Sequence, residues 1–222
     1  MTKNNTVKSL LAFGILALGS AAPSWAVSIP VTNFSFESPA APLGNDCGTG
    51  CSFNFGPVTG WTITVNGGVF HPDSSRFNFP LPDGDQTAYN NGGSLSQTLA
   101  ATLQNSTTYT LNVAVGNRLD PQGFPGYSVA LLAGSTVLGT ESSQTPALGD
   151  FALSTVTFTS AAVDPLAGQA LSIVLTSTGG GQTNFDNVRL DAVSSVPEPS
   201  SLLLLSGGLV GVLAIARRKR RV

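Results

Sequence analysis

A two-residue period in the apolar side chains is the feature that most constrains how residues 27–195 of this chain can fold. The clearest run is Thr108–Val115, in which Tyr109, Leu111 and Val113 alternate with polar residues. Short runs of this kind recur between clusters of Gly, Pro, Asn and Asp, and no long segment shows the 3.6-residue period of a helix. Because alternation puts the apolar side chains on one face of a strand, the pattern predicts an all-β domain, an antiparallel β-sandwich.

The other expected strands follow the same pattern. They are Ile29–Phe34, Trp61–Val65, Gln86–Tyr89, Ser94–Leu99, Ser128–Leu132, Phe151–Thr159, Leu171–Leu175 and Asn184–Leu190. Asn90–Gly93 has the composition of a hairpin turn. The stretch Asn66–Gly84 is rich in proline and phenylalanine, and we expect it to be a long loop that has some function, because compact domains rarely carry so long a loop otherwise.

The N-terminus has the three parts of a secretory signal peptide. Lys3 and Lys8 form a positive region, Leu10–Ala22 is apolar, and Ser24-Trp25-Ala26 offers the small residues that a signal peptidase reads. We therefore expect residues 1–26 to be a signal peptide that is cleaved after Ala26. The alternative is an uncleaved membrane anchor.

The C-terminus has the parts of a membrane tail. Pro197, Glu198 and Pro199 precede an apolar run, Leu202–Ala216, and five consecutive cations follow at Arg217–Arg221. A helix over this run would span about 22 Å, which is short of a bilayer core of about 30 Å but insertable if the bilayer thins. The cations would stay in the cytoplasm, so that everything before the run lies outside.

This tail resembles the PEP-CTERM sorting signals of exported bacterial proteins over residues 196–222. The resemblance implies that an exosortase recognises and removes the tail, and it links the protein to exopolysaccharide and biofilm. The chain would then be anchored transiently in the cytoplasmic membrane before it reaches the cell surface or extracellular matrix. A plain C-terminal anchor is the alternative. The exported domain would comprise residues 27–195.

The exported region is strongly acidic, which the whole-chain charge of −2 conceals. It contains three arginines, no lysine and eleven acidic residues, so its net charge is about −8. Nucleic-acid binding is excluded as a function class, because that binding depends on neutralising phosphates with cations. Neutral sugars and divalent cations remain compatible with this charge.

Cys47 and Cys51 are the only cysteines, in Cys-Gly-Thr-Gly-Cys. Paired cysteines outside the cytoplasm usually oxidise, so we expect a disulfide. Zinc is the alternative, but it needs about four ligands and His71 is the only histidine.

The order of several motifs resembles that of the galactose-binding-domain-like jelly rolls, which include carbohydrate-binding modules. These motifs are Asn33-Phe34-Ser35-Phe36-Glu37, Gly60-Trp61, Pro82-Asp83-Gly84-Asp85-Gln86, and Phe185-Asp186-Asn187-Val188. The resemblance implies that the first and last strands are neighbours and that Glu37 and Asp186 help to hold a structural calcium ion. Otherwise Glu37 is a solvated edge residue and Asp186 caps a turn.

Sugar binding is the function that this resemblance implies. The candidate ligand-binding residues are Trp61, His71, Tyr89 and Arg118. Each also has a structural reading, as a core residue, a loop residue or the partner of an acid such as Asp120.

No catalytic motif stands out, because the chain lacks a Gly-x-Ser-x-Gly elbow and a phosphate-binding loop. Asp83, Asp85 and Glu141 could act as paired carboxylates, but Pro82–Asp85 reads as a turn. We therefore expect a non-catalytic protein, not an enzyme, that binds extracellular polysaccharide. The alternative is a structural matrix protein that self-associates or binds other proteins.

Overall fold

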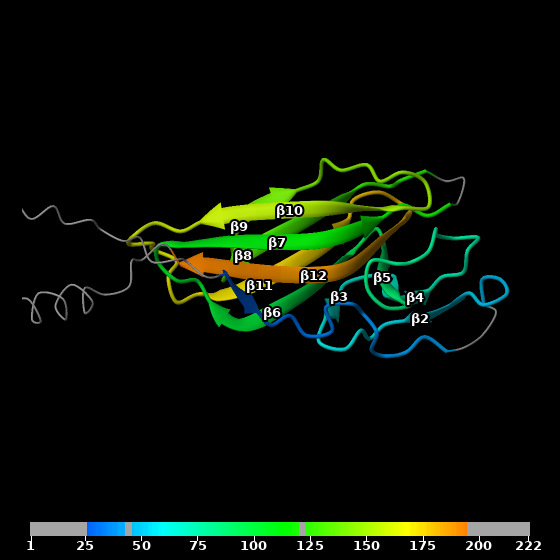
Figure 1. Cartoon of the computed structure of the whole chain (residues 1–222). Helices are drawn as coiled ribbons and strands as arrows, with labels where there is room; N and C mark the ends of the chain where they lie inside the picture. Colours follow the sequence, from blue (N-terminus) through cyan, green and yellow to red (C-terminus); the bar gives the residue numbers. More distant parts are fainter. Residues whose placement is uncertain (1–25, 43–45, 120–122, 195–222) are drawn as a thin grey trace, which may run out of the picture. The chain divides into compact units, whose positions relative to one another are not determined.

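The computed structural model describes residues 26–42, 46–119 and 123–194, which form an antiparallel sandwich of two β-sheets (Figure 1). The first sheet has the order β10-β7-β12-β5-β4-β2, with β1 paired to β12, and the second has the order β3-β6-β11-β8-β9. This arrangement confirms the predicted all-β sandwich.

The strand bounds of the first sheet are β1 (Ala26–Ile29), β2 (Ser52–Phe55), β4 (Gly67–His71), β5 (Thr87–Asn91), β7 (Thr107–Gly116), β10 (Phe151–Thr159) and β12 (Gln182–Ser194). Those of the second sheet are β3 (Thr62–Ile63), β6 (Ser94–Thr102), β8 (Tyr127–Ala133), β9 (Thr136–Glu141) and β11 (Ala170–Ser177).

The core lies between the two sheets and takes one side of each alternating strand. On β7, Tyr109, Leu111 and Val113 are almost fully buried among core residues of the facing sheet, such as Leu131 and Ile173. The intervening residues of β7 lie on the outer face of the first sheet. The period-2 pattern thus sets which face of each strand is buried.

Three of the local predictions are wrong. The first strand ends at Ile29 rather than Phe34, because the chain turns at residues 32–35. The stretch Asn66–Gly84 is not all loop, since it contains β4. Asn90–Gly93 does not close a hairpin, because β5 belongs to the first sheet and β6 to the second.

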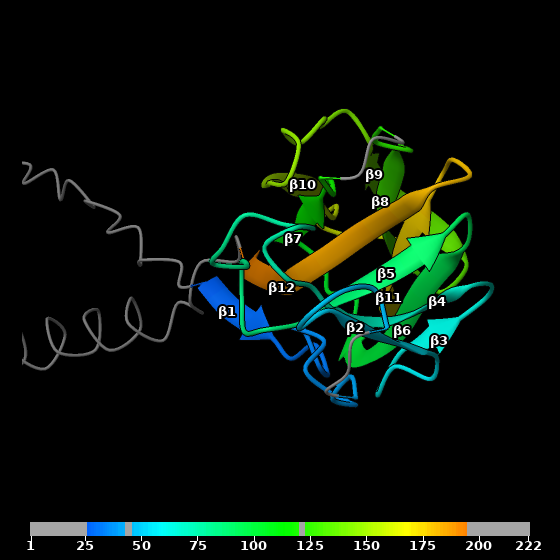
Figure 2. The ribbon, with the colours of Figure 1, turned by 90° about the vertical axis from the view of Figure 1, so that its right-hand side faces the viewer.

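The first and last strands of the domain are neighbours. Strand β1 pairs antiparallel with the end of β12, with Ala26 opposite Val193 and Ile29 opposite Leu190 (Figure 2). Just beyond β1, the Val188 N–H donates to the Phe34 carbonyl at 2.9 Å. The segment that carries Glu37 is therefore held beside the segment that carries Asp186.

A bulge interrupts β12 between Asp186 and Arg189. Asp186 lies opposite Ala114 and Arg189 lies opposite Asn112, so three steps along β12 correspond to two steps along β7. Asn187 takes up the extra length with a φ of 50°, a conformation that asparagine tolerates better than most residues. The bulge puts Asp186 and Arg189 on the same, outer face of the first sheet.

A disulfide joins Cys47 and Cys51, as predicted, and closes the loop that leads into β2. Within residues 26–42, 46–119 and 123–194, no helix is long and apolar enough to cross a membrane. The predicted signal peptide up to Trp25 and the predicted span at Leu202–Ala216 lie outside the described residues.

Candidate functional site

The outer face of the first sheet carries a row of side chains that runs across six strands. Directly paired positions, from β10 to β2, are Phe151, Gly116, Asn184, Tyr89, Gly68 and Phe55. Residues opposite one another on adjacent strands share a face. The row therefore places aromatic rings at both ends of this face and polar groups in its middle.

Four rings form what we call the aromatic cluster: Phe53, Phe55, Phe70 and Tyr89. The ring of Tyr89 lies 6.5 Å from Phe53, 6.3 Å from Phe55 and 6.4 Å from Phe70, centroid to centroid, in edge-to-face geometry. Tyr89 is 3% exposed and Phe55 is 64% exposed, so the cluster runs from the protein interior out to solvent.

Close packing of the strands beneath the aromatic cluster depends on Gly68 of β4. A Cβ there would lie 1.8 Å from the Asn54 carbonyl oxygen, which no side chain could accommodate without moving β2. The Tyr89 hydroxyl is buried without a hydrogen-bond partner among the described residues, and burial raises the pKa of this phenol to about 12. Tyr89 therefore stays neutral at physiological pH.

A polar chain runs beside the aromatic cluster. The Arg118 guanidinium lies 5.2 Å from the centre of the Phe70 ring and donates to the Gln182 side-chain oxygen. The Gln182 amide donates to Asn184 at 3.1 Å, and the Asn184 amide donates to the Thr87 hydroxyl at 2.8 Å. One cation and several amides thus border an otherwise apolar region.

The segment between β4 and β5, residues 72–86, covers this face. Phe77 is fully buried and stacks on Phe151 with ring centroids 4.8 Å apart. Asn78 fixes the segment to the loop before β10 through its N–H to the Gly149 carbonyl (2.8 Å) and its side-chain amide to Asp150 (2.7 Å). Leu81 packs in the same apolar group as Phe70 and Tyr89.

Asp186 is a fully buried carboxyl on this face, next along β12 from Asn184. Its Oδ2 accepts the Asp83 N–H at 3.0 Å and its Oδ1 accepts the Asn187 N–H at 2.7 Å. Burial raises the pKa of this carboxyl to about 8, and the nearby carboxylates of Asp83 and Glu37 add to the effect, against the opposing influence of the two N–H donors. Asp186 therefore keeps its proton at neutral pH.

A short turn, Asp83–Gln86, lies directly over Asp186, and we call it the covering turn. Glu37 Oε1 accepts the N–H groups of Asp85 (2.9 Å) and Gln86 (2.8 Å), while Asp186 accepts that of Asp83. Glu37 and Asp186 therefore hold the two halves of one turn.

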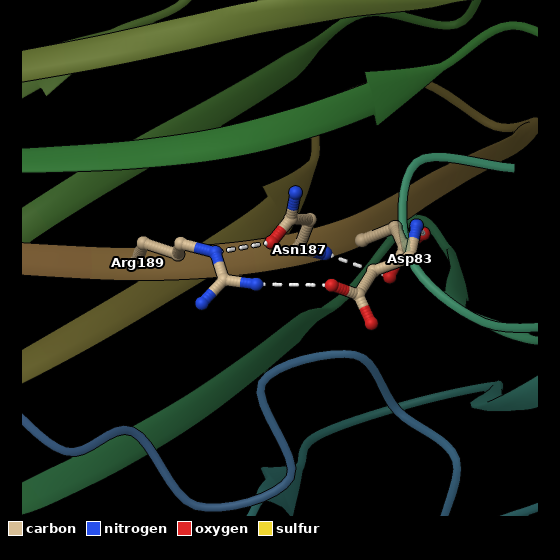
Figure 3. A network of polar contacts seen from close by, with 4 residues as sticks. Asp83, Asn187 and Arg189 are labelled. Atoms are coloured by element: carbon tan, nitrogen blue, oxygen red, sulfur yellow. Dashed lines mark hydrogen bonds and ion pairs between the residues drawn. The ribbon is translucent and has the colours of Figure 1, made fainter.

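An arginine fastens the same turn from the outside (Figure 3). Arg189 forms an ion pair with Asp83 at 2.9 Å, and its Nε donates to the Asn187 side chain at 2.7 Å. The guanidinium also lies 4.4 Å from the centre of the Phe34 ring. The β12 bulge makes this possible, because it brings Asn187 and Arg189 to the same edge of the turn.

The carboxylates of Glu37 and Asp186, the predicted calcium ligands, accept backbone hydrogen bonds in this arrangement. Glu37 Oε1 and both Asp186 oxygens face backbone N–H donors, whereas a cation needs converging oxygens. Across residues 26–42, 46–119 and 123–194, no group of three or more His, Cys, Asp or Glu side chains could hold a metal ion. Calcium binding stays a prediction that a binding measurement must test.

The four predicted ligand-binding residues occupy different places. Tyr89 and Arg118 come together around Phe70 on the outer face. Trp61 packs in the main core on Phe36, with ring centroids 5.2 Å apart, and its indole N–H donates to the Thr32 carbonyl at 3.1 Å. His71 ends β4 opposite Ser52.

An open hollow of about 580 Å³ borders the aromatic cluster. Phe55, Trp61, Ile63 and Val65 supply apolar parts of its lining. Small-molecule sites commonly have this volume. Trp61 lines this hollow in addition to its core contacts, and the hollow extends the apolar surface beyond Phe55.

Sequence reasoning missed the strand that supplies half of the aromatic cluster. Phe53 and Phe55 lie two residues apart in Ser52-Phe53-Asn54-Phe55, which is a short alternating pattern. That spacing predicts two rings on one face and could have been recognised. The pairing of Asp83 with Arg189 had no comparable signal, because the two residues are 106 positions apart.

Comparisons with known proteins match both the domain and the tail. Residues 27–191 match the HpiC1-like family, described as HpiC1 cyclase, and residues 195–221 match the PEP-CTERM protein-sorting motif. The second match confirms the predicted tail, and this motif implies export and exosortase processing. No curated protein matches the chain.

Several solved cyclases resemble the domain. An apo cyclase from Fischerella sp. is 33% identical, with a TM-score of 0.67 over 75% of this chain and 96% of that chain. The Stig cyclase Fisc from Fischerella sp. TAU, in complex with (3Z)-3-(1-methyl-2-pyrrolidinylidene)-3H-indole, is 33% identical, with a TM-score of 0.68 over 78% of this chain and 99% of that chain. A cyclase from the same source in complex with 4-(1H-indol-3-yl)butan-2-one is 33% identical, with a TM-score of 0.67 over 77% and 100%.

These findings overturn the expectation of a non-catalytic polysaccharide-binding or structural protein, because cyclases are enzymes. The likeness to sugar-binding modules is weak. A family 16 carbohydrate-binding module gives a TM-score of only 0.37 at 18% identity, which does not support sugar binding. The motifs around Glu37 and Asp186 indicate that the chain folds as a β-sandwich, but they do not indicate which ligand it binds.

Proposed function

This chain belongs to the HpiC1-like cyclase family, and on that premise we propose that it closes a ring in an indole-bearing substrate. The substrate binds on the outer face of the first sheet, against the aromatic cluster and beneath the segment 72–86. Asp186 acts as the proton donor. The class of substrate comes from two relatives, both solved with indole compounds.

Asp186 is the observation that carries this proposal. A carboxyl group with an ordinary pKa has lost its proton at pH 7 and cannot act as an acid. Burial raises the pKa of Asp186 to about 8, so that most of the molecules hold the proton at pH 7. Matching the pKa of an acid to the working pH is a recurrent feature of proton-transfer catalysis.

The chemistry that this site supports is proton-initiated ring closure. The proton of Asp186 passes to one carbon of a substrate double bond, which leaves a cation on its partner. A second π-bond of the substrate attacks that cation, a new carbon–carbon bond closes the ring, and a proton returns to the Asp186 carboxylate. The product is an isomer of the substrate, so the reaction consumes no oxidant, reductant or co-substrate.

The aromatic cluster suits the cationic stage of this reaction. Ring faces attract cations more strongly when water is excluded, and both Phe70 and Tyr89 are nearly inaccessible to solvent. The neutral Tyr89 phenol adds no charge that would trap the cation. The rings also supply flat apolar surfaces against which an indole can stack.

The covering turn must lift before substrate can reach Asp186, which is fully buried. The fastening outside the turn is weak, because the Arg189 and Asp83 side chains are 49% and 33% exposed. An ion pair with that exposure contributes about 0.2–1 kcal/mol. The ion pair is thus the weaker part of what holds the turn, and substrate binding must also offset the three hydrogen bonds that Glu37 and Asp186 accept from it.

The experiment is an isomerisation assay with the purified chain. Indoles that carry alkenyl side chains are incubated with the protein, and the products are separated by chromatography with mass detection. We expect a new species with the mass of the substrate, and its loss in Asp186→Asn. Asp191→Asn is the matched control, since Asp191 lies on the same outer face of β12 but outside the covering turn. Equal turnover by Asp186→Asn and the unaltered chain would refute the role of Asp186.

The same assay tests calcium. Each reaction is run with added calcium and with a chelator, and calcium binding is measured directly by titration calorimetry. Binding that disappears in Glu37→Gln would support the calcium prediction. A cation at Asp186 would also lower the pKa of its carboxyl, so activity that rises with calcium would contradict the proton-donor role.

A further inference from the structure

We propose that one end of the sandwich faces a lipid surface for as long as the sorting tail remains uncut. We call it the tether end. It consists of the start of β1, the end of β12, and the connections at residues 103–106, 134–135 and 160–169. The inference rests on the PEP-CTERM tail and is independent of the proposed cyclase activity.

Strand pairing brings both chain ends to the tether end. Ala26, the first described residue, lies opposite Val193, and Ser194, the last, lies opposite Thr107. Thr108 in turn lies opposite Thr159, where β10 ends. Figures 1 and 2 show β1 beside the last part of β12. The two predicted processing points, after Ala26 and at Pro197–Pro199, therefore attach to one end of the fold.

The length of chain outside the domain prevents an inverted orientation. Seven residues lie between Ser194 and Leu202, where the apolar run begins, so the eight steps from one to the other reach at most about 29 Å. Strand β12 has 13 residues and is about 43 Å long at about 3.3 Å per residue. Because the connection is shorter than the domain, the far end cannot turn to meet the membrane.

The distribution of acidic residues favours a domain that meets the membrane with its tether end over one that lies on its side. Asp164 is the only acidic residue in the tether-end connections, and its carboxylate accepts the N–H groups of Ala161 (3.2 Å) and Leu166 (2.9 Å). The acid-bearing segments 46–51, 72–86 and 142–150 lie toward the opposite end (Figure 1). Anionic lipids repel acids, so the tether end is the part of this acidic domain best suited to lie against them.

The tether end exposes two valines. Val163 is 86% exposed and Val27 is 64% exposed. A cleft of about 730 Å³ also opens there, with Ile29, Ala101 and Ala192 in its lining. An apolar, nearly uncharged surface next to a membrane tail fits the interfacial region of a bilayer. Asp186 lies eight residues along β12 from Ser194, about 26 Å away, so the candidate site stays clear of the lipid.

The test uses the full chain, with its tail intact, reconstituted in vesicles of phosphatidylethanolamine and phosphatidylglycerol. Both native cysteines form the disulfide, so an added cysteine is the only free thiol. Val163→Cys and Ala162→Cys report on the tether end, Thr145→Cys on the opposite end, and Leu153→Cys on the outer face of the first sheet. Each thiol carries a fluorophore, and lipids with nitroxide headgroups act as quenchers.

We expect the labels at positions 162 and 163 to lose most of their fluorescence when nitroxide lipids are present, and those at 145 and 153 to keep theirs. Quenching at 153 as strong as at 163 would show a domain lying on its side. Quenching at 145, or at no position, would likewise overturn the inference. Two tether-end variants are used so that a misfolded one does not decide the result, and none of these outcomes depends on turnover of an indole.

Discussion

The buried carboxyl of Asp186 predicts an unusual dependence of stability on pH, which Asp186→Asn should abolish. The pKa of this group is raised from 3.8 to about 8 on folding. Between those two values the folded chain holds a proton that the unfolded chain has released. The free energy of unfolding therefore falls as pH rises from about 3.8 to about 8. The bound proton makes its full contribution to stability only below pH 3.8.

The magnitude follows from the size of the pKa difference. Each pKa unit corresponds to about 1.36 kcal/mol. From about pH 5 to about pH 8, Asp186 should lower the free energy of unfolding by up to about 4 kcal/mol. Local opening of the covering turn would admit water to the ionised carboxylate, which makes this figure an upper limit. It is still a large share of the 5–15 kcal/mol typical of a domain.

The assay is urea denaturation of the chain and of Asp186→Asn at a series of pH values. Asparagine has one acceptor oxygen for the two N–H groups that Asp186 accepts, so the variant loses about 1–3 kcal/mol at acidic pH. The difference between the two proteins should then shrink or reverse toward pH 8. Two parallel pH curves would refute the reasoning, because they would mean that Asp186 does not hold its proton in the folded state.

Three further outcomes can be measured. Gly84→Ala should lower the melting temperature more than Gly168→Ala does. Both glycines have a positive φ, but only a Cβ at Gly84 would clash with Glu37, at 2.3 Å from its Oε1. Equal losses of melting temperature would contradict the role of Glu37 in holding the turn. Burial raises the pKa of Glu141, but hydrogen bonds from one tyrosine and two serines outweigh it and lower the pKa to about 2. The ionised carboxylate therefore stabilises the fold above pH 4.5, and this stabilisation is lost as pH falls from 4.5 toward 2. Glu141→Gln should remove this pH dependence, and acid denaturation curves that coincide for the two proteins would contradict the prediction. Tyr89→Phe should leave stability unchanged or raised in thermal melts, because the hydroxyl has no hydrogen-bond partner among the described residues and its burial costs free energy. A loss above about 1 kcal/mol would reveal an overlooked partner.

The sequence predicted the fold because alternation is a local property. Tyr109, Leu111 and Val113 identify a core-facing strand without knowledge of any partner, and the same holds for β11 and β12. Strand β4 was not predicted, because its two glycines, Gly67 and Gly68, are typical of a loop when only one sequence is read. The close packing of β4 requires these glycines. The sheet to which each strand belongs was not predicted either, because no local sequence pattern shows that the chain crosses from the first sheet to the second after Asn91.

The candidate site could be predicted only in part. Asp186 was recognised as important from its motif, but its raised pKa depends on burial beneath a turn 103 residues away in the chain. Tyr89 and Arg118 were chosen by residue type alone, and their contact through Phe70 depends on the pairing of separate strands. Their role in ligand binding stays a prediction. The non-catalytic interpretation failed because a sandwich framework is shared by binding modules and enzymes.

The central claim is that an indole-bearing molecule binds the outer face of the first sheet beside Asp186. A crystal structure of the chain with 4-(1H-indol-3-yl)butan-2-one, the compound bound by one relative, tests it most directly. The account predicts the indole ring in contact with the aromatic cluster, the covering turn displaced, and the Asp186 carboxyl within hydrogen-bonding distance of the compound. Binding in the tether-end cleft alone, with the covering turn closed over Asp186, would contradict it.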